Sequence, residues 1–175
     1  MKRKLIYLSL GILIVIATMV SVVSFFSPLR RGWLLRHALI SAAADASSIR
    51  VVEHSDRFDH PDEMKNYKEK IYGTVTLSAD QVSGLLKAFP LSLDYSGMMA
   101  KKCIFSSHHR VEFLRRNGKA TVLEICFLCR EIDFDGGGQR IMPVGWPSSL
   151  QSFVVSLGMS PTPKDANNAG ASGSP

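Results

Sequence analysis

The sequence lacks the local motifs by which many enzyme families are recognised. It contains no Gly-x-Ser-x-Gly and no His-Glu-x-x-His, which would supply a nucleophile or a pair of metal ligands. Its one glycine run, residues 136–138, lies between two expected strands and does not open a helix as a phosphate-binding loop does. No reaction follows from these residues, so the sequence favours a non-enzymatic protein over an enzyme.

The larger part of the chain also lacks an excess of either charge. The net charge of +6 arises from six basic residues within the first 36 positions, whereas residues 37–175 contain 15 basic and 15 acidic side chains. Nucleic-acid binding needs a basic surface that neutralises phosphates. We therefore expect no nucleic-acid partner, and we attribute the early basic residues to lipid headgroups.

Charged residues are absent from Leu5 to Phe26, a run of 22 positions. A helix of this length covers ~33 Å, and the hydrocarbon core of a bilayer measures ~30 Å. The apolar part of a signal peptide is shorter, ~7 to 15 residues, and precedes a small-residue cleavage site, whereas this run is followed by Ser27 and Pro28. We therefore expect an uncleaved transmembrane anchor over residues 1–27, with the lipid bilayer as partner. The sequence names no protein partner.

The orientation of this anchor depends on the basic residues beside it. Three precede the run, and three more follow it within ten positions, so the positive-inside comparison is almost balanced. Only a short, highly charged tail precedes the run, and its transfer across the bilayer would be costly. This favours an N-terminus inside the cell and an extracytoplasmic C-terminal domain in a single-pass protein of the cell membrane.

The rest of the chain divides into three segments by composition and period. The sequence predicts a juxtamembrane helix over residues 28–47, an α+β domain over residues 48–158 and a disordered tail over residues 159–175. The expected fold class is α+β, with an N-terminal transmembrane helix followed by a small antiparallel β-meander packed with two or three helices.

Two periods place the elements of that domain. Helical spacing predicts a helix from the capping box of Ser78 and Gln81 to Phe89, and a second helix over residues 150–157. Alternation of apolar and polar side chains is typical of half-buried strands. It predicts six of them, over residues 49–53, 71–77, 108–116, 119–127, 130–135 and 139–144.

The dipeptide Asn117-Gly118 lies between the third and fourth of these strands. It is typical of a two-residue type I′ turn, which requires positive φ at both positions. Such a turn fixes the register of the hairpin. We expect His109 to face Cys126 and Val111 to face Glu124.

One group of residues has the side chains that a zinc or thiol site needs. Zinc binds about four nitrogen or sulfur ligands, and Cys-x-x-Cys is also a redox motif. On a regular strand, however, two residues three positions apart point to opposite faces. We therefore expect no cofactor and keep zinc as the alternative. Also open are one disulfide from Cys103 to Cys126 or Cys129, and three inert thiols in a core strand. The candidate metal ligands are Cys103, His108, His109, Cys126 and Cys129.

The pattern Cys103-Ile-Phe-Ser-Ser-His-His, followed by Ile125-Cys-Phe-Leu-Cys, resembles one found in uncharacterised bacterial exported or membrane-anchored proteins. The likeness covers about 30 residues, and Ser107 stands where that pattern has proline. It implies export of a small domain and no known activity.

The segment from His54 to Glu63 is rich in histidine and carboxylate side chains, but their spacing is irregular. We interpret it as a solvated loop. The chain is therefore expected to be a membrane-anchored protein with a small extracytoplasmic binding or assembly module. The alternative is a zinc-binding or thiol-redox domain that uses the cysteine and histidine cluster.

Overall fold

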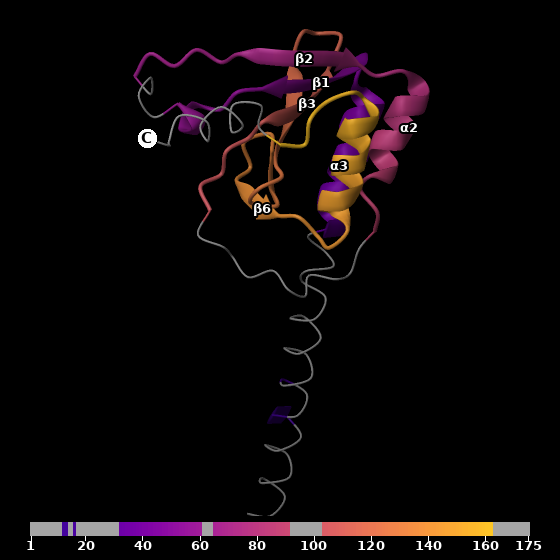
Figure 1. The fold of residues 1–175 in the computed structure, drawn as a ribbon. Coiled ribbons are helices and arrows are strands. Elements are labelled where there is room, and N and C mark those ends of the chain that lie inside the picture. Colours follow the sequence, from indigo (N-terminus) through magenta and orange to yellow (C-terminus); the bar gives the residue numbers. More distant parts are fainter. Residues whose placement is uncertain (1–11, 14–15, 17–31, 61–64, 92–102, 163–175) are drawn as a thin grey trace, which may run out of the picture.

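The computed structural model describes residues 12, 13, 16, 32–60, 65–91 and 103–162 (Figure 1). Among these residues, no helix is both long and apolar enough to cross a membrane. This finding overturns the fold class predicted above, which began with a transmembrane helix. Apart from residues 12, 13 and 16, the expected anchor lies outside the described residues, as does most of the expected tail.

The described residues contain one antiparallel sheet of six strands in the order β2-β1-β3-β4-β5-β6. Its central strands β1, β3 and β4 contribute Ile49, Val51, Val111, Phe113, Leu123 and Ile125 to the buried core. The bounds are β1 Ser48–His54, β2 Ile71–Thr76, β3 His109–Leu114, β4 Ala120–Cys126, β5 Glu131–Phe134 and β6 Gln139–Ile141.

The expected meander is wrong at its beginning. β1 lies between β2 and β3 and pairs with both strands, so β3 is not the neighbour of the strand that precedes it in the chain. The reason lies in the burial of β1. Val51 and Val52 point to opposite faces of the sheet, and both are at most 3% exposed, which is typical of a central strand covered on both sides.

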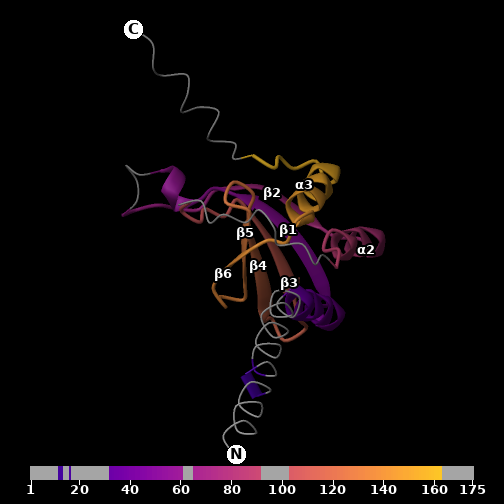
Figure 2. The same ribbon diagram turned by 90° about the horizontal axis from the view of Figure 1, so that it is seen from below.

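Helices cover one face of the sheet (Figure 2). They are a helix over residues 32–45, α2 (Ala79–Lys87) and α3 (Trp146–Ser156). The first buries a stripe with helical spacing at Leu35, Leu39 and Ala42. These helices meet the inward side chains of the sheet in one core, which includes Leu85, Phe89, Val111, Phe113, Leu123, Ile125, Trp146 and Leu150.

The capping box predicted for α2 is confirmed. The Ser78 hydroxyl accepts a hydrogen bond from the Gln81 backbone N–H at 3.3 Å, and Oε1 of Gln81 accepts one from the Ser78 backbone N–H at 2.9 Å. Two N–H groups that a helix start leaves unpaired are thereby satisfied.

The register predicted for the β3–β4 hairpin is wrong by one residue. His109 faces Ile125 and Val111 faces Leu123. Gly118 has a φ of 78°, but among the described non-glycine residues only Arg130 and Asp135 have positive φ. The loop therefore has three residues, 116–118, with glycine in the left-handed position, which is the second common type of hairpin. The shift places Leu123 in the core, with 0% exposure.

Candidate functional site

The structure divides the predicted cysteine and histidine cluster. Cys103 and Cys129 form a disulfide with a Cα–Cα distance of 5.7 Å, which is one of the two pairings left open by the sequence. Cys126 is a free thiol with 0% exposure. Residues 127–130 form a turn instead of a regular strand, so the argument that Cys126 and Cys129 must diverge does not hold. The turn brings the Cys129 backbone N–H within 3.3 Å of Cys126 Sγ.

The two histidines of the cluster are buried near the start of β3. His109 is 1% exposed and lies edge-on to the ring of Phe127, with centroids 5.2 Å apart, and His108 is 8% exposed. Among the described residues, no group of three or more histidine, cysteine and acidic side chains could hold a metal ion. Two of the three sulfurs form the disulfide and are not thiolate ligands, while Cys126 is out of reach of an external thiol substrate.

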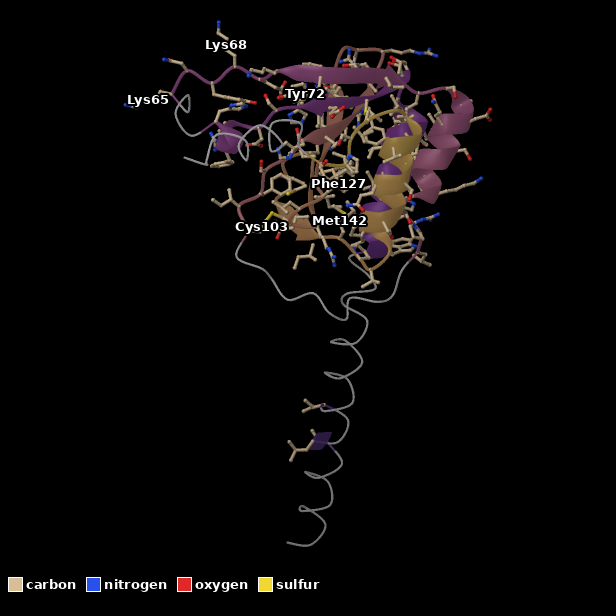
Figure 3. All side chains as sticks on the ribbon, in the orientation of Figure 1. Lys65, Lys68, Tyr72, Cys103, Phe127 and Met142 are labelled. Carbon is tan, nitrogen blue, oxygen red and sulfur yellow. A yellow bond between two sulfur atoms is a disulfide. The ribbon has the colours of Figure 1, made fainter. Side chains whose placement is uncertain are left out.

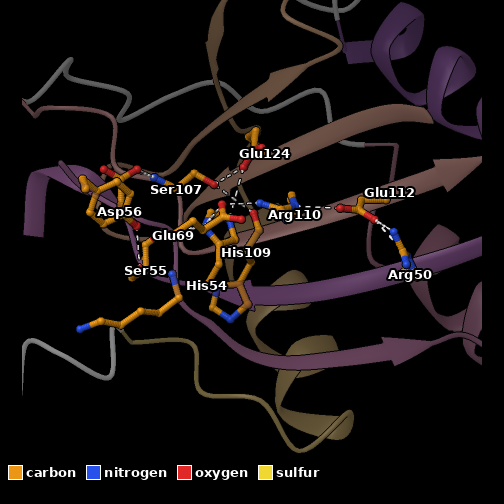
Figure 4. A network of polar contacts seen from close by, with 12 residues as sticks. Arg50, His54, Ser55, Asp56, Glu69, Ser107, His109, Arg110, Glu112 and Glu124 are labelled. Atoms are coloured by element: carbon orange, nitrogen blue, oxygen red, sulfur yellow. Dashed lines mark hydrogen bonds and ion pairs between the residues drawn. The ribbon is translucent and has the colours of Figure 1, made fainter. Parts of the chain in front are cut away.

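A polar network that the sequence did not reveal lies on the sheet face opposite the helices (Figure 4). Along β3, buried residues alternate with Arg110 and Glu112, which therefore point away from the core. Glu112 accepts hydrogen bonds from Arg110 at 2.8 Å and from Arg50 of β1 at 2.5 Å. Arg110 also pairs with Glu69. Burial raises the pKa of Glu112, but the two guanidinium groups outweigh it and hold that pKa below its ordinary value.

His54, the last residue of β1, lies at the end of this network. Its side chain is 5% exposed. Nδ1 is 2.9 Å from the Ser55 carbonyl oxygen and 3.2 Å from Oε1 of Glu69, and Nε2 is 3.6 Å from Oε2 of Glu124. Burial lowers the pKa of His54, but the contacts with Glu124 and the Ser55 carbonyl outweigh it, so the pKa is raised.

The carboxylate of Glu124, on β4, contacts both the His54 imidazole and the Ser107 hydroxyl. Ser107 Oγ donates to Oε2 of Glu124 and lies 3.2 Å from the His109 carbonyl oxygen. Burial raises the pKa of Glu124, whereas the nearby His54 imidazole and the hydrogen bond from Ser107 lower it, and the net effect is a lowered pKa. His54 and Glu124 thus stabilise each other's charged forms.

A pocket of about 480 Å³ opens beside this pair. Three carboxylates line it, from Asp56, Glu69 and Glu124, together with the cationic side chain of Arg57 and the ring of His54. Its apolar lining is mainly aromatic and comes from Phe58, Tyr67 and Phe105, with Ile104.

The disulfide holds one wall of this pocket. Residues 104–107 lie between Cys103 and the start of β3, so the bond to Cys129 fixes their outer end to the turn after β4. Their inner end is fixed by the Ser107 backbone N–H, which donates to Oδ2 of Asp56 at 3.0 Å. Asp56 also accepts the Phe58 backbone N–H at 2.9 Å. The segment from His54 to Glu63 was interpreted above as a solvated loop. Its first five residues, His54 to Phe58, line the pocket instead.

Comparison of the chain with protein-family models, with curated proteins and with solved structures finds no match.

Proposed function

We propose that this domain is an extracytoplasmic binding module at the cell membrane, and that its pocket binds a small ligand with a cationic group. The observation that carries the proposal is the lining of the pocket. Three carboxylates face one arginine and one histidine, beside three aromatic rings.

The carboxylates are available to a ligand. The side chains of Glu69 and Glu124 are 38% and 32% exposed, so they are desolvated in part and still open to the pocket. A charge-assisted hydrogen bond to an amine or guanidinium is about twice as strong as a neutral one. The low pKa of Glu124 keeps its carboxylate ionised for such a contact.

The aromatic side chains favour a cation that carries an apolar stem. Phe58 is 38% exposed and already has the Arg57 guanidinium 4.9 Å from its ring centroid. Rings at such distances attract cations through their quadrupole. A ligand guanidinium or amine would gain from both the rings and the carboxylates, whereas an anionic ligand would gain from neither.

The same geometry favours binding over catalysis. A nucleophilic hydroxyl needs a neighbouring base. The Ser107 hydroxyl donates to Glu124, whose lowered pKa makes it a weak base. The Ser55 hydroxyl is 2.6 Å from the Tyr67 hydroxyl and accepts the Lys70 backbone N–H. The His54 ring instead contacts the Ser55 carbonyl oxygen and the carboxylates of Glu69 and Glu124.

The extracytoplasmic location and the position at the membrane are each supported by one observation. Disulfides such as that of Cys103 and Cys129 persist in oxidising compartments and are rare in the cytosol. The uncharged residues from Leu5 to Phe26, with basic residues on both sides, support a position at the cell membrane.

Binding of butylguanidinium to the full chain in detergent tests the function, with butylurea as the uncharged isostere. We expect the cation to bind and butylurea to bind at least about tenfold more weakly. Glu69→Gln and Glu124→Gln should each weaken cation binding about tenfold. Glu112→Gln is the matched control, because Glu112 belongs to the same network but does not line the pocket. Equal affinity for both probes, or equal loss in all three variants, would contradict the proposal.

A further inference from the structure

Six large apolar side chains at one end of the domain are exposed to solvent, with exposed fractions from 46% to 76%. They come from five separate parts of the chain. We call them the apolar rim: Trp33, Leu34, Leu91, Ile104, Leu128 and Val144.

The disulfide and the sheet connect one half of the rim. Ile104 and Leu128 are each adjacent in sequence to a cysteine of the Cys103–Cys129 bond, and Cys129 Sγ lies 3.1 Å from the Ile104 carbonyl oxygen. The turn that contains Leu128 continues to Arg130, whose carbonyl accepts the Met142 backbone N–H at 2.9 Å. Val144 follows two residues later. Figure 3 shows Cys103 and Met142 at the same margin of the domain.

Two side-chain hydrogen bonds connect the other half. Trp146 Nε1 donates to the Pro90 carbonyl at 2.7 Å, which places Leu91 beside the start of α3 and therefore near Val144. Arg36 Nε donates to the Phe89 carbonyl at 3.0 Å, which places the first turn of the helix over residues 32–45 against the same segment. The six rim residues thus belong to neighbouring segments.

The chain that reaches the rim indicates what covers it. The described helix begins at residue 32, only six positions after Phe26, where the run of 22 uncharged residues ends. A lipid environment around that run would therefore end within a few residues of Trp33. Tryptophan and leucine beside arginine are typical of the headgroup region of a bilayer, and Arg36 and Arg130 border the rim.

The opposite end of the sheet has a different character. The β3–β4 loop there contains the exposed residues Arg115, Arg116, Asn117 and Lys119. This loop is therefore less suited to an apolar surface than the rim.

We propose that the apolar rim rests on the headgroup interface of the lipid bilayer and fixes the orientation of the domain on the membrane. This inference depends on the membrane location in the proposed function. It does not depend on what the pocket binds, although Ile104 belongs both to the rim and to the lining of the pocket. The apolar area of the rim and its bordering arginines supply the binding energy, as in other interfacial segments.

Tryptophan reporters in the full chain test this contact. In a Trp33→Phe background, Leu128→Trp or Ile104→Trp places a fluorophore at the rim, and Val155→Trp is the control. Val155 is 53% exposed on α3, nine residues or ~14 Å along the helix from Trp146. The buried Trp146 gives a constant background in all three variants.

The variants are reconstituted in phosphatidylcholine–phosphatidylglycerol vesicles that contain lipid brominated near the headgroup. We expect the two rim reporters to shift to shorter wavelength and to be quenched about twofold more than the α3 reporter. Quenching at the rim no greater than at Val155, in a chain that floats with the vesicles, would overturn the rim contact alone. A chain that does not float would overturn the membrane location as well. A rim shift that follows protein concentration without lipid quenching would indicate a second copy and would also overturn it.

Discussion

Nε2 of His54 lies 3.6 Å from Oε2 of Glu124, although the two residues belong to β1 and β4 with β3 between them. The side chain of Arg110, on the intervening strand, lowers the pKa of His54, whereas Glu124 raises it. The net result is a buried histidine that is stabilised in its charged form.

The stability of the protein should therefore depend on pH through His54. A raised folded-state pKa adds stability below the ordinary value of 6.5, and this added stability is lost as the pH rises through the raised pKa. We expect the free energy of unfolding of the parent, relative to His54→Gln, to fall over that range. Urea unfolding at a series of pH values measures it. A constant difference between the two proteins would show that His54 does not titrate in this way.

Protons and a cationic ligand should compete in the pocket. Protonated His54 neutralises part of the charge on Glu69 and Glu124, with which it is in contact. We expect the affinity for butylguanidinium to increase as the pH rises through the pKa of His54, because the ligand then no longer meets a positive imidazole. The His54→Gln variant should bind with an affinity that changes little over the same range. A decrease in affinity with rising pH in the parent would point to an anionic ligand.

Local signals in the sequence were sufficient for most elements of the domain. Six strands and the capping box of α2 follow from alternation and from Ser78 and Gln81. The order of the strands does not follow, because the pairing of β1 with β3 joins residues about 60 positions apart, and no local period encodes it. The hairpin register failed for a smaller reason, since Asn-Gly is compatible with two loop lengths that differ by one residue.

The polar network and the pocket were missed because their residues come from separate segments. His54, Glu69, Ser107 and Glu124 meet only after the sheet has formed. One signal was present, since Arg110 and Glu112 alternate with buried positions on β3, and such residues on a central strand need charged partners on neighbouring strands. The partners themselves depend on a register that the sequence left wrong by one.

Removal of the disulfide should affect both stability and binding. Its cysteines are 26 residues apart, and chain-entropy arguments give about 3.5 kcal/mol for a closed loop of this size. We expect Cys103→Ser with Cys129→Ser to lose stability of that order and to bind butylguanidinium more weakly, because residues 104–107 are no longer fixed. Cys126→Ala, which keeps the disulfide, is the control. Unchanged binding in the double variant would show that the pocket does not depend on the disulfide.

The capping box of α2 should contribute measurably to stability. Ser78→Ala removes the acceptor for the Gln81 backbone N–H, and the loss of an N-cap costs about 1 kcal/mol. Ser83 is exposed within the same helix, so Ser83→Ala should leave the free energy of unfolding unchanged or slightly higher. Chemical unfolding of both variants makes the comparison. Equal destabilisation would mean that helix propensity, and not capping, controls this end of α2.

The β3–β4 hairpin supplies the most direct test of the corrected turn. Gly118 has a φ of 78°, and an added Cβ would meet no atom within 4 Å, so any cost of substitution comes from backbone strain and not from a clash. A β-branched residue resists this conformation, whereas asparagine adopts it more readily. We expect Gly118→Val to lose more than about 1 kcal/mol of stability and Gly118→Asn to lose clearly less. Asn117→Val should be tolerated better than Gly118→Val, because Asn117 does not have positive φ. Equal losses at both positions would support the two-residue turn predicted from the sequence, in which both residues need positive φ.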